Sequence, residues 1–413
     1  MRILVLTHYY PPEIGAPQAR LSEMALSWKN QGHAITVLTG FPNHPTGIIP
    51  EKYKGKFFAA ETENGMTVWR HWLYATPNEG FIRRTLNHLS FMFTSVLFSL
   101  FRGEKPDAIL VSSPTLFSVI SAYVMSVFRQ TPFIFEVRDL WPGIFIELGI
   151  LKNRFLIAVL ECLELFLYKK AAHVVTVTEG FKKNLVSRGI SENKISVITN
   201  GADLNKFFPV PEKPAERKEW GIPENVFLAS YIGAHGMSHG LASILDAANM
   251  LQLKKEPIHF LFVGEGSEKE KCINKAEKLK LKNVTFLGGQ PKEKIPSFYQ
   301  LSDLCLVSLR SIPGFKSFIP SKMFEMMACG KPVLGAVEGE AADILTRSKG
   351  AIVVPPENSG AIAEHIVTLK DNPLKLSEMG KNASHFVIEH YNREKLALKY
   401  LDVFKTVSRK SPL

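Results

Sequence analysis

Short hydrophobic runs alternate with longer amphipathic segments along the first half of the chain. The runs at residues 2–7, 34–39 and 66–73 are typical of buried β-strands, and a helical pattern at residues 19–31 separates the first two. This order predicts a βαβ unit with parallel strands. Further strands are predicted at residues 108–112, 133–137, 174–178 and 195–199. The first half is therefore predicted to be a doubly wound α/β domain.

The same cycle begins again in the second half. Residues 208–223 are rich in proline and charge and show no periodicity, which is typical of a domain boundary. Strands are then predicted at residues 227–232, 258–263, 284–287 and 304–308, with helices at 241–253 and 268–279. We predict three parts: domain 1–205, domain 206–390, and a C-terminal helix, 391–413, that packs back on the first domain. A ligand is expected in the cleft between the two domains.

Composition narrows the class of protein. A chain of 413 residues at 46% hydrophobic content is long enough for two ordinary domains. The net charge of +11 favours anionic small molecules or an anionic membrane surface over nucleic acid. Four widely spaced cysteines, with no metal-ligand spacing, predict a reducing compartment and no structural zinc. The N-terminal apolar run resembles a first strand rather than a signal peptide, and no transmembrane helix is predicted.

Two helices of the first half are unusually apolar. Residues 81–102 and 155–170 are flanked by arginine and lysine. Such helices can lie in a membrane interface, with the apolar stripe among the lipids and the basic side chains near anionic head groups. The alternative is that both are core helices packed on the sheet.

Glycine-rich loops follow several predicted strands of the second half. They occur at residues 233–240, 264–266 and 288–289, and a Gly/Pro loop leads into a short helix that begins near Ser321. Together they could form a cradle for a nucleotide diphosphate. The candidate ligands in these loops are Gly233, His239, Gly264, Glu265, Gly288 and Gln290.

The short helix presents two charged side chains on one face. Lys322 and Glu325 are three residues apart, Ser321 is the predicted N-cap, and Gly330 is the predicted left-handed stop. A cation there suits a phosphate, and a carboxylate one turn later suits sugar hydroxyls. The alternative is a solvated ion pair on a surface helix.

Arg138 and Asp139 directly follow a predicted strand of the first half. Because ligands of open α/β sheets bind beyond the carboxyl ends of strands, this pair is placed to act in catalysis or to orient a substrate. A buried Arg–Asp pair that fixes the loop is the alternative. His44, in the long loop 40–55, is a weaker candidate for contact with the acceptor, and Gly15 allows close approach of a ligand before the first helix.

Several common nucleotide sites are missing. The chain has no GxxxxGK[ST] loop, no GxGxxG after the first strand, and no acidic pair of the DxD kind. A phosphate-loop nucleotidase, a dehydrogenase and a metal-bridged diphosphate are therefore not expected. Backbone N–H groups, His239 and Lys322 would supply the compensating positive charge.

Several segments resemble one known family. PFIFEVRDLWP, VITNGAD, FLFVGEGSEKE, VTFLGGQPKEKIPSFYQLSDLCLVSL and PSKMFEMMACGKPVL are similar to family 4 glycosyltransferases of the GT-B type, in order along nearly the whole chain. Within that family the chain resembles bacterial transferases that add N-acetyl-L-fucosamine in O-antigen or capsule assembly.

The resemblance implies two Rossmann-like domains that face each other across a cleft, and a retaining transfer from a UDP-sugar without cofactor or metal. It implies that Glu325 holds the ribose hydroxyls, that Gly15 lies against the diphosphate, and that Arg138 stands where the family has a histidine near the transferred sugar. Ser317 stands where the family has a first glutamate, and His239 where it has a lysine. Lys322 is the candidate replacement cation.

The sequence is compatible with three functions. The first is transfer to a polyprenyl-diphosphate-linked saccharide by a cytoplasmic protein held peripherally on the inner face of the plasma membrane. The second is a UDP-sugar 2-epimerase of the same fold, which would leave the apolar helices unexplained. The third is a non-catalytic, membrane-associated scaffold that binds a nucleotide sugar.

Overall fold

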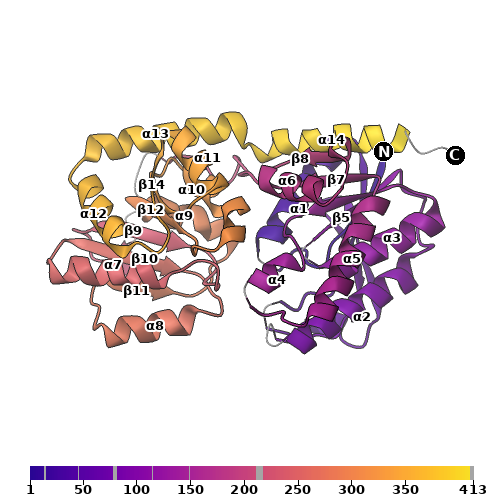
Figure 1. The fold of residues 1–413 in the computed structure, drawn as a ribbon, viewed down its shortest axis with the longest axis horizontal. Helices are drawn as coiled ribbons and strands as arrows, with labels where there is room; N and C mark the ends of the chain where they lie inside the picture. The colour runs from indigo at the N-terminus through magenta and orange to yellow at the C-terminus, as the bar shows by residue number, and fades with distance from the viewer. Residues whose placement is uncertain are drawn as a thin grey trace. The chain divides into compact units, whose positions relative to one another are not determined.

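A computed structural model describes residues 1–13, 15–44, 46–77, 81–113, 115–147, 149–210 and 217–409. The chain forms two compact units (Figure 1). Unit 1 comprises Met1–Thr199 and Glu394–Leu413, and unit 2 comprises Asn200–Arg393. The predicted linker, 208–223, lies partly outside the described residues.

Unit 1 contains an eight-stranded sheet in the order β3-β4-β2-β1-β5-β6-β7-β8. All neighbouring strands are parallel except β3, which pairs antiparallel to β4 at one edge. Strand β3 was not predicted, because the ETE sequence at its end is typical of a polar loop. The strands are β1 (Arg2–Leu6), β2 (Ala34–Gly40), β3 (Phe58–Glu63), β4 (Met66–His71), β5 (Ala108–Ser112), β6 (Phe133–Val137), β7 (His173–Thr176) and β8 (Ile195–Val197).

Helices cover both faces of this sheet, and β1 shows why. Its residues alternate: Leu4 and Leu6 join one buried cluster, whereas Ile3 and Val5 join the other. The first cluster includes side chains of α2 (Phe81–Ser99), α3 (Leu116–Arg129), α5 (Arg154–Lys170) and α6 (Glu179–Ser187). The second includes side chains of α1 (Ala16–Asn30) and α14 (Arg393–Arg409). The short helix α4 (Gly143–Glu147) follows β6.

The return of the chain to unit 1 is fixed by direct contacts. Trp28 on α1 donates from its indole nitrogen to the carbonyl of Ala397 on α14, at 2.8 Å. The rings of Tyr400 and Phe404 pack edge-on against the same tryptophan. The last helix is therefore part of the core of the first unit.

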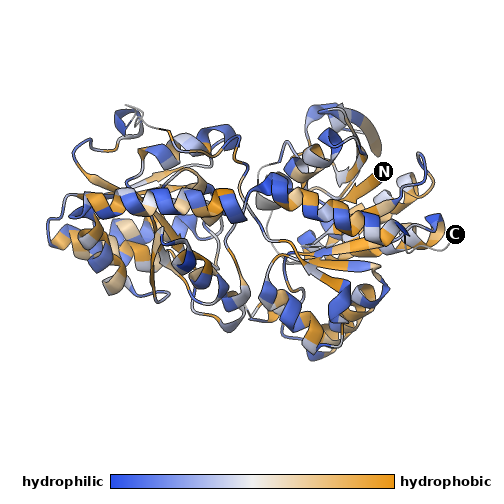
Figure 2. Ribbon diagram, turned by 90° about the horizontal axis from the view of Figure 1, so that it is seen from above, coloured by the Kyte–Doolittle hydropathy of each residue, from blue (hydrophilic) through white to orange (hydrophobic). Residues whose placement is uncertain are grey.

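Unit 2 contains a six-stranded, fully parallel sheet in the order β11-β10-β9-β12-β13-β14. Figure 2 shows the strands of both sheets mainly in the hydrophobic colour, as expected for strands covered on both faces. The strands are β9 (Phe227–Ile232), β10 (Ile258–Val263), β11 (Val284–Leu287), β12 (Leu304–Ser308), β13 (Val333–Ala336) and β14 (Ala351–Val354). The helices are α7 (Ala242–Leu253), α8 (Lys269–Lys278), α9 (Ile295–Leu301), α10 (Lys322–Ala328), α11 (Glu340–Ser348), α12 (Ser359–Lys370) and α13 (Pro373–His390).

The predicted fold class is confirmed: both units are Rossmann-like, with helices on a mostly parallel sheet. One local prediction is wrong. Ser321 precedes α10 in a helical conformation, and its side chain makes no capping hydrogen bond. Gly330 has a φ of 70°, so the predicted left-handed stop is confirmed. Among the described residues, no helix is both long and apolar enough to cross a bilayer.

Candidate functional site

The sheet of unit 2 changes winding direction between β9 and β12. From β9 the chain moves outward to β10 and β11, and it then returns to place β12 on the other side of β9. Loops at the carboxyl ends of such neighbouring strands diverge and leave a crevice, which is where open α/β sheets bind ligands. The two loops at this point carry Gly233, after β9, and Lys322, after β12.

Lys322 is a buried cation that no hydrogen bond neutralises. Its Nζ atom lies 3.5 Å from the centroid of the Tyr231 ring. That nitrogen is inaccessible to solvent and has no hydrogen-bond partner. Burial lowers the pKa of the Lys322 ammonium well below its ordinary value. A buried ammonium is costly unless an anion joins it, so the side chain is prepared for a negatively charged ligand.

Glycines make room around this lysine. Gly233 has a φ of 144°, and a Cβ atom there would lie 3.0 Å from Cδ of Lys322. Gly264, after β10, has a φ of 146°, and a Cβ atom there would lie 2.0 Å from the carbonyl oxygen of Gly233. These two positions therefore require glycine both for their backbone conformation and for the close contact between their loops.

Hydrogen bonds join the loops after β9, β10 and β11. The backbone N–H of His235 donates to the carbonyl of Glu265 at 2.8 Å. The Glu265 carboxylate accepts from Lys269 at 2.7 Å and from the N–H of Gly289 at 3.1 Å. Gln290 donates to the carbonyl of Gly288 at 3.4 Å. The predicted residues of these loops therefore form one connected rim.

Two histidines line the same region in a neutral state. His239 lies with Nδ1 3.3 Å from the Ser308 carbonyl, and burial, aided by Lys322, lowers its pKa to about 3. His235 is fully buried, and its pKa is lowered to about 4 by the same two causes. His235 was not predicted as a site residue, because only its tertiary contact with the β10 loop distinguishes it from an ordinary loop histidine.

The remaining predicted residues of unit 2 lie on the segment that leads into α10. Ser317 ends the 3₁₀ turn Pro313–Ser317, and Glu325 is half-buried on α10. Among the described residues no ion pair joins Lys322 to Glu325, so the alternative of a solvated surface pair is not supported. The ribose contact expected of Glu325 remains a prediction.

In unit 1, Arg138 and Asp139 follow β6 at the carboxyl edge of the sheet. Arg138 is 8% exposed, and its backbone N–H donates to the Ser113 hydroxyl at 2.8 Å. No ion pair joins Arg138 to Asp139 in the described part of the chain, so the alternative of a buried pair is also not supported. Burial raises the pKa of the Asp139 carboxyl, and the positive charge of Arg138 opposes this shift.

His44 lies within a cluster of aromatic and polar side chains. Its backbone N–H donates to Glu13 at 2.8 Å, and its ring lies 5.3 Å from that of Tyr9. His8, His88, Asn87 and Arg84 line the same small pocket or contact its walls. These residues were not predicted because they come from the loop after β1 and from α2, which are far apart along the chain.

Gly15 lies immediately before α1 with an extended backbone, and its carbonyl accepts from the N–H of Ala19. A Cβ atom there would lie 2.5 Å from the flexible Gln18 side chain. The contact with a diphosphate expected of Gly15 remains a prediction.

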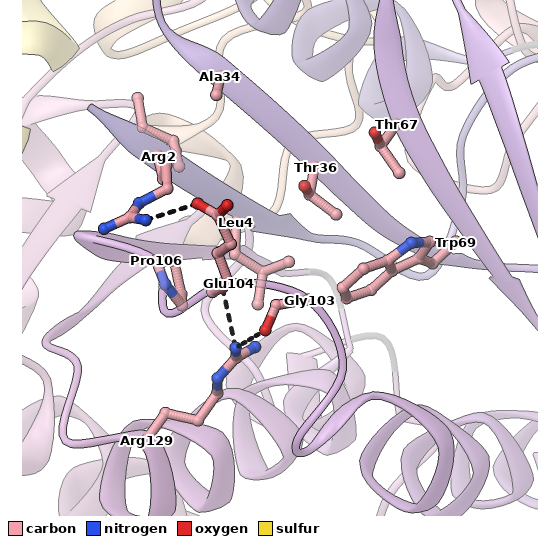
Figure 3. A pocket seen from close by; sticks show the side chains of 11 residues that line it. Arg2, Leu4, Ala34, Thr36, Thr67, Trp69, Gly103, Glu104, Pro106 and Arg129 are labelled. Atoms are coloured by element: carbon pink, nitrogen blue, oxygen red, sulfur yellow. Dashed lines mark hydrogen bonds and ion pairs between the residues drawn. The ribbon is translucent and has the colours of Figure 1, made fainter.

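A larger cavity of about 240 Å³ lies at the opposite, amino end of the unit 1 strands (Figure 3). Arg2 is paired there with Glu104, and Arg129 donates to the carbonyls of Gly103 and Glu104. Both arginine side chains that line the cavity are thus engaged within the protein. It does not include any predicted site residue.

Comparisons with known proteins identify the family of this chain. Residues 15–201 match the family model "Glycosyl transferase 4-like domain", and residues 212–386 match "Glycosyl transferases group 1". The chain is a GT-B glycosyltransferase. The second match contains the whole glycine-and-lysine region of unit 2, and the first contains Arg138, Asp139 and His44.

Relatives and solved structures extend this result. The glycosyltransferase is 25% identical over 376 residues to the putative colanic acid biosynthesis glycosyl transferase WcaI of Escherichia coli, covering 89% of this chain and 91% of that protein. Sucrose-phosphate synthase from Thermosynechococcus elongatus shares the fold with a TM-score of 0.75 at 18% identity, and 98% of each chain is covered. HepE from Anabaena, solved with UDP-glucose, gives a TM-score of 0.74 at 16% identity, covering 98% and 100% of the two chains.

Proposed function

We propose that this glycosyltransferase moves a sugar, with retention of configuration, from a UDP-sugar to a polyprenyl-diphosphate-linked saccharide. The product would belong to a bacterial surface polysaccharide such as O-antigen or capsule. The transferred sugar is an N-acetylated hexosamine, such as the 6-deoxy sugar N-acetyl-L-fucosamine. The reaction needs no cofactor or metal, and it takes place at the inner face of the plasma membrane.

The buried Lys322 ammonium, with the glycines packed around it, is the observation that carries the donor assignment. The leaving group of a sugar transfer is a nucleoside diphosphate, which gains negative charge as the glycosidic bond breaks. A cation and backbone N–H groups already fixed at that position stabilise the developing charge without reorganisation. HepE, a protein of the same fold, was solved with UDP-glucose, which supports a uridine nucleotide as the donor.

Arg138 and Asp139 are the proposed polar groups of unit 1. A carboxylate whose pKa is raised by burial is a better proton acceptor than an exposed one, so Asp139 is suited to receive a proton from an attacking hydroxyl. WcaI, by its description, acts in colanic acid biosynthesis, which supports a polysaccharide acceptor.

Exposed apolar side chains support a lipid-linked acceptor. Ile82, Leu86, Phe93 and Leu97 share one outward face of α2, and Phe155 and Val159 are exposed on α5. Helix α3 packs against both of these helices. Exposed Arg83, Arg84, Lys169 and Lys170 lie on the same two helices. An apolar face bordered by cations suits the interface of an anionic bilayer.

A transfer assay tests the proposal. The protein is incubated with a panel of labelled UDP-sugars, with and without a lipid-linked acceptor extract. Label that moves into the lipid fraction supports the transferase. Label that stays in an altered free UDP-sugar would indicate an epimerase, and saturable UDP binding without any reaction would indicate a scaffold. Lys322→Ala and Glu325→Ala should each reduce transfer strongly, and full activity in both would refute the donor assignment.

A further inference from the structure

The guanidinium of Arg138 is a second buried cation that lacks a partner. The residue is 8% exposed, and its Nε and Nη1 atoms are inaccessible to solvent with no hydrogen-bond acceptor among the described residues. Only its backbone N–H is engaged, by the Ser113 hydroxyl. A guanidinium in this state is energetically costly, because it has lost water and has gained no acceptor in return.

The carboxylate of Glu136, two residues earlier on β6, does not fill this role. It accepts from Arg20 Nε at 2.9 Å, from Ser112 Oγ at 2.6 Å and from the hydroxyl of Tyr400. Its charge is thus paired with Arg20. Glu136 still attracts the positive charge of Arg138 at longer range, but the Nε and Nη1 atoms of Arg138 have no hydrogen-bond acceptor among the described residues.

Asp139 acts on Arg138 only through the longer-range attraction of the two charges. The described part of the chain contains no ion pair or hydrogen bond between the two side chains. The Asp139 carboxyl is also less readily ionised than usual, because burial raises its pKa. The unsatisfied N–H groups of Arg138 therefore suit an acceptor that comes from outside the protein.

We propose that Arg138 binds an anionic group of a substrate, such as a phosphate or a carboxylate. This group is not the diphosphate of the donor, because unit 2 already provides Lys322 for that diphosphate. The inference rests on the proposed transferase function. A planar guanidinium with free N–H donors binds a phosphate or a carboxylate through paired hydrogen bonds. The proposed function supplies such a group in the phosphate of its prenyl-linked acceptor. A carboxylate on the donor sugar has the same chemistry, and its binding at Arg138 would replace the N-acetylated hexosamine as the proposed donor.

Direct binding measurements test this inference, because they do not depend on turnover. Calorimetric titrations use UDP, UDP-glucose, UDP-glucuronic acid and farnesyl diphosphate as probes. The variants are Arg138→Gln, Arg138→Lys, which keeps the charge, and Arg2→Gln, which removes an exposed arginine at the opposite, amino end of the unit 1 strands. Loss of Arg138 removes an unpaired buried charge, so the glutamine variant is expected to fold normally.

We expect Arg138→Gln to weaken binding of either farnesyl diphosphate or UDP-glucuronic acid at least tenfold, relative to UDP-glucose. Binding of UDP itself should stay within about twofold, Arg138→Lys should restore part of the loss, and Arg2→Gln should have no effect. A loss confined to farnesyl diphosphate identifies the acceptor phosphate, and a loss confined to UDP-glucuronic acid identifies an acidic donor. An equal loss for UDP, or no loss for any probe, overturns the inference. Absence of sugar transfer by a wild-type protein that shows these binding differences would instead overturn the proposed function.

Discussion

Arg20 donates through Nε to Glu136 Oε1 at 2.9 Å, although the two residues are 116 positions apart in the sequence, and both side chains are buried. Arg20 also donates to the carbonyls of Ile198 and Thr199, where the chain leaves unit 1. Tyr400, on the helix that returns to unit 1, donates to the same carboxylate. The Arg20–Glu136 ion pair is thus bonded both to the segment that leaves unit 1, at Ile198 and Thr199, and to the helix that returns to it, at Tyr400.

This network predicts a large loss of stability in unit 1 when one partner is removed. Arg20→Ala leaves Glu136 buried without its counter-ion, so we expect the free energy of unfolding to fall by about 3–5 kcal/mol. Tyr400→Phe removes the hydrogen bond that Tyr400 donates to Glu136 and the longer one, 3.4 Å, that it accepts from Arg20, and it should cost about 1.5–3 kcal/mol. Chemical denaturation measures the loss, and hydrogen exchange of unit 1 peptides assigns it to this unit.

The exposed Arg2–Glu104 pair provides the control for the buried network. Its two side chains are 50% and 78% exposed, so water and salt screen the interaction. Arg2→Ala should therefore leave the denaturation curve unchanged within error. An effect as large as that of Arg20→Ala would contradict the role given to burial.

Lys322 is expected to lower the stability of the unliganded protein and to strengthen the binding of UDP. Lys322→Met replaces an unpaired buried ammonium with an apolar side chain of similar length, so the unliganded protein should be more stable by about 1–3 kcal/mol. The same change should weaken UDP binding at least tenfold, because the ligand loses a buried cation. Thermal unfolding and calorimetry on one preparation measure both effects. Lys316→Met, which removes a more exposed lysine of the same segment, should change neither.

The lowered pKa of Lys322 also predicts a pH dependence. Between the pKa of Lys322 in the fold and its higher value in the unfolded chain, the unfolded chain binds one more proton. The free energy of unfolding should therefore rise with pH across that window, and this part of the slope should be absent in Lys322→Met. UDP binding should change in the opposite direction, since protonated Lys322 is the form that attracts the diphosphate. Both pH dependences can be measured by following the free energy of unfolding and the UDP affinity between about pH 6 and pH 10. This range lies below the ordinary pKa of lysine.

The contact between the β9 and β10 loops predicts which glycine can be replaced. Gly264→Ala places a methyl group 2.0 Å from a backbone oxygen, so the loops must separate and UDP binding should be lost or strongly reduced. Gly236→Ala, in the β9 loop, meets nothing closer than 3.7 Å and should bind UDP normally. Equal binding by the two variants would show that the close approach does not matter.

The apolar face of α2 and α5 predicts binding to anionic vesicles. Phe93→Ser, Leu97→Ser and Phe155→Ser each remove an exposed side chain whose burial in lipid would contribute about 1.5–3 kcal/mol. Each should weaken partitioning into phosphatidylglycerol vesicles roughly tenfold or more. Leu253→Ser and Leu374→Ser, at similarly exposed positions of unit 2, are the controls. If the Phe93, Leu97 and Phe155 variants cosediment with vesicles as well as the wild-type protein does, the proposed membrane contact of α2 and α5 is wrong.

Local patterns determined the fold class and much of the candidate donor site. Hydrophobic periodicity identified β9, β10, β11 and β12, because strands covered on both faces must be apolar. Glycines at the ends of those strands marked the loops, since only glycine allows their backbone angles and close contacts. The spacing of Lys322 after β12 placed a cation near those loops. All of this information lies within a few residues of each feature.

Tertiary structure alone decided which charges are buried and which are paired. The sequence cannot tell that Glu136 is paired with Arg20 and so leaves Arg138 without a partner, because those contacts join β6 to helices at both ends of the chain. In the same way, His235 and His8 became candidates only when loops distant in the sequence met at the edges of the two sheets. Which side chains are buried and paired depends on contacts between elements that are distant in the sequence, and a local sequence pattern does not contain this information.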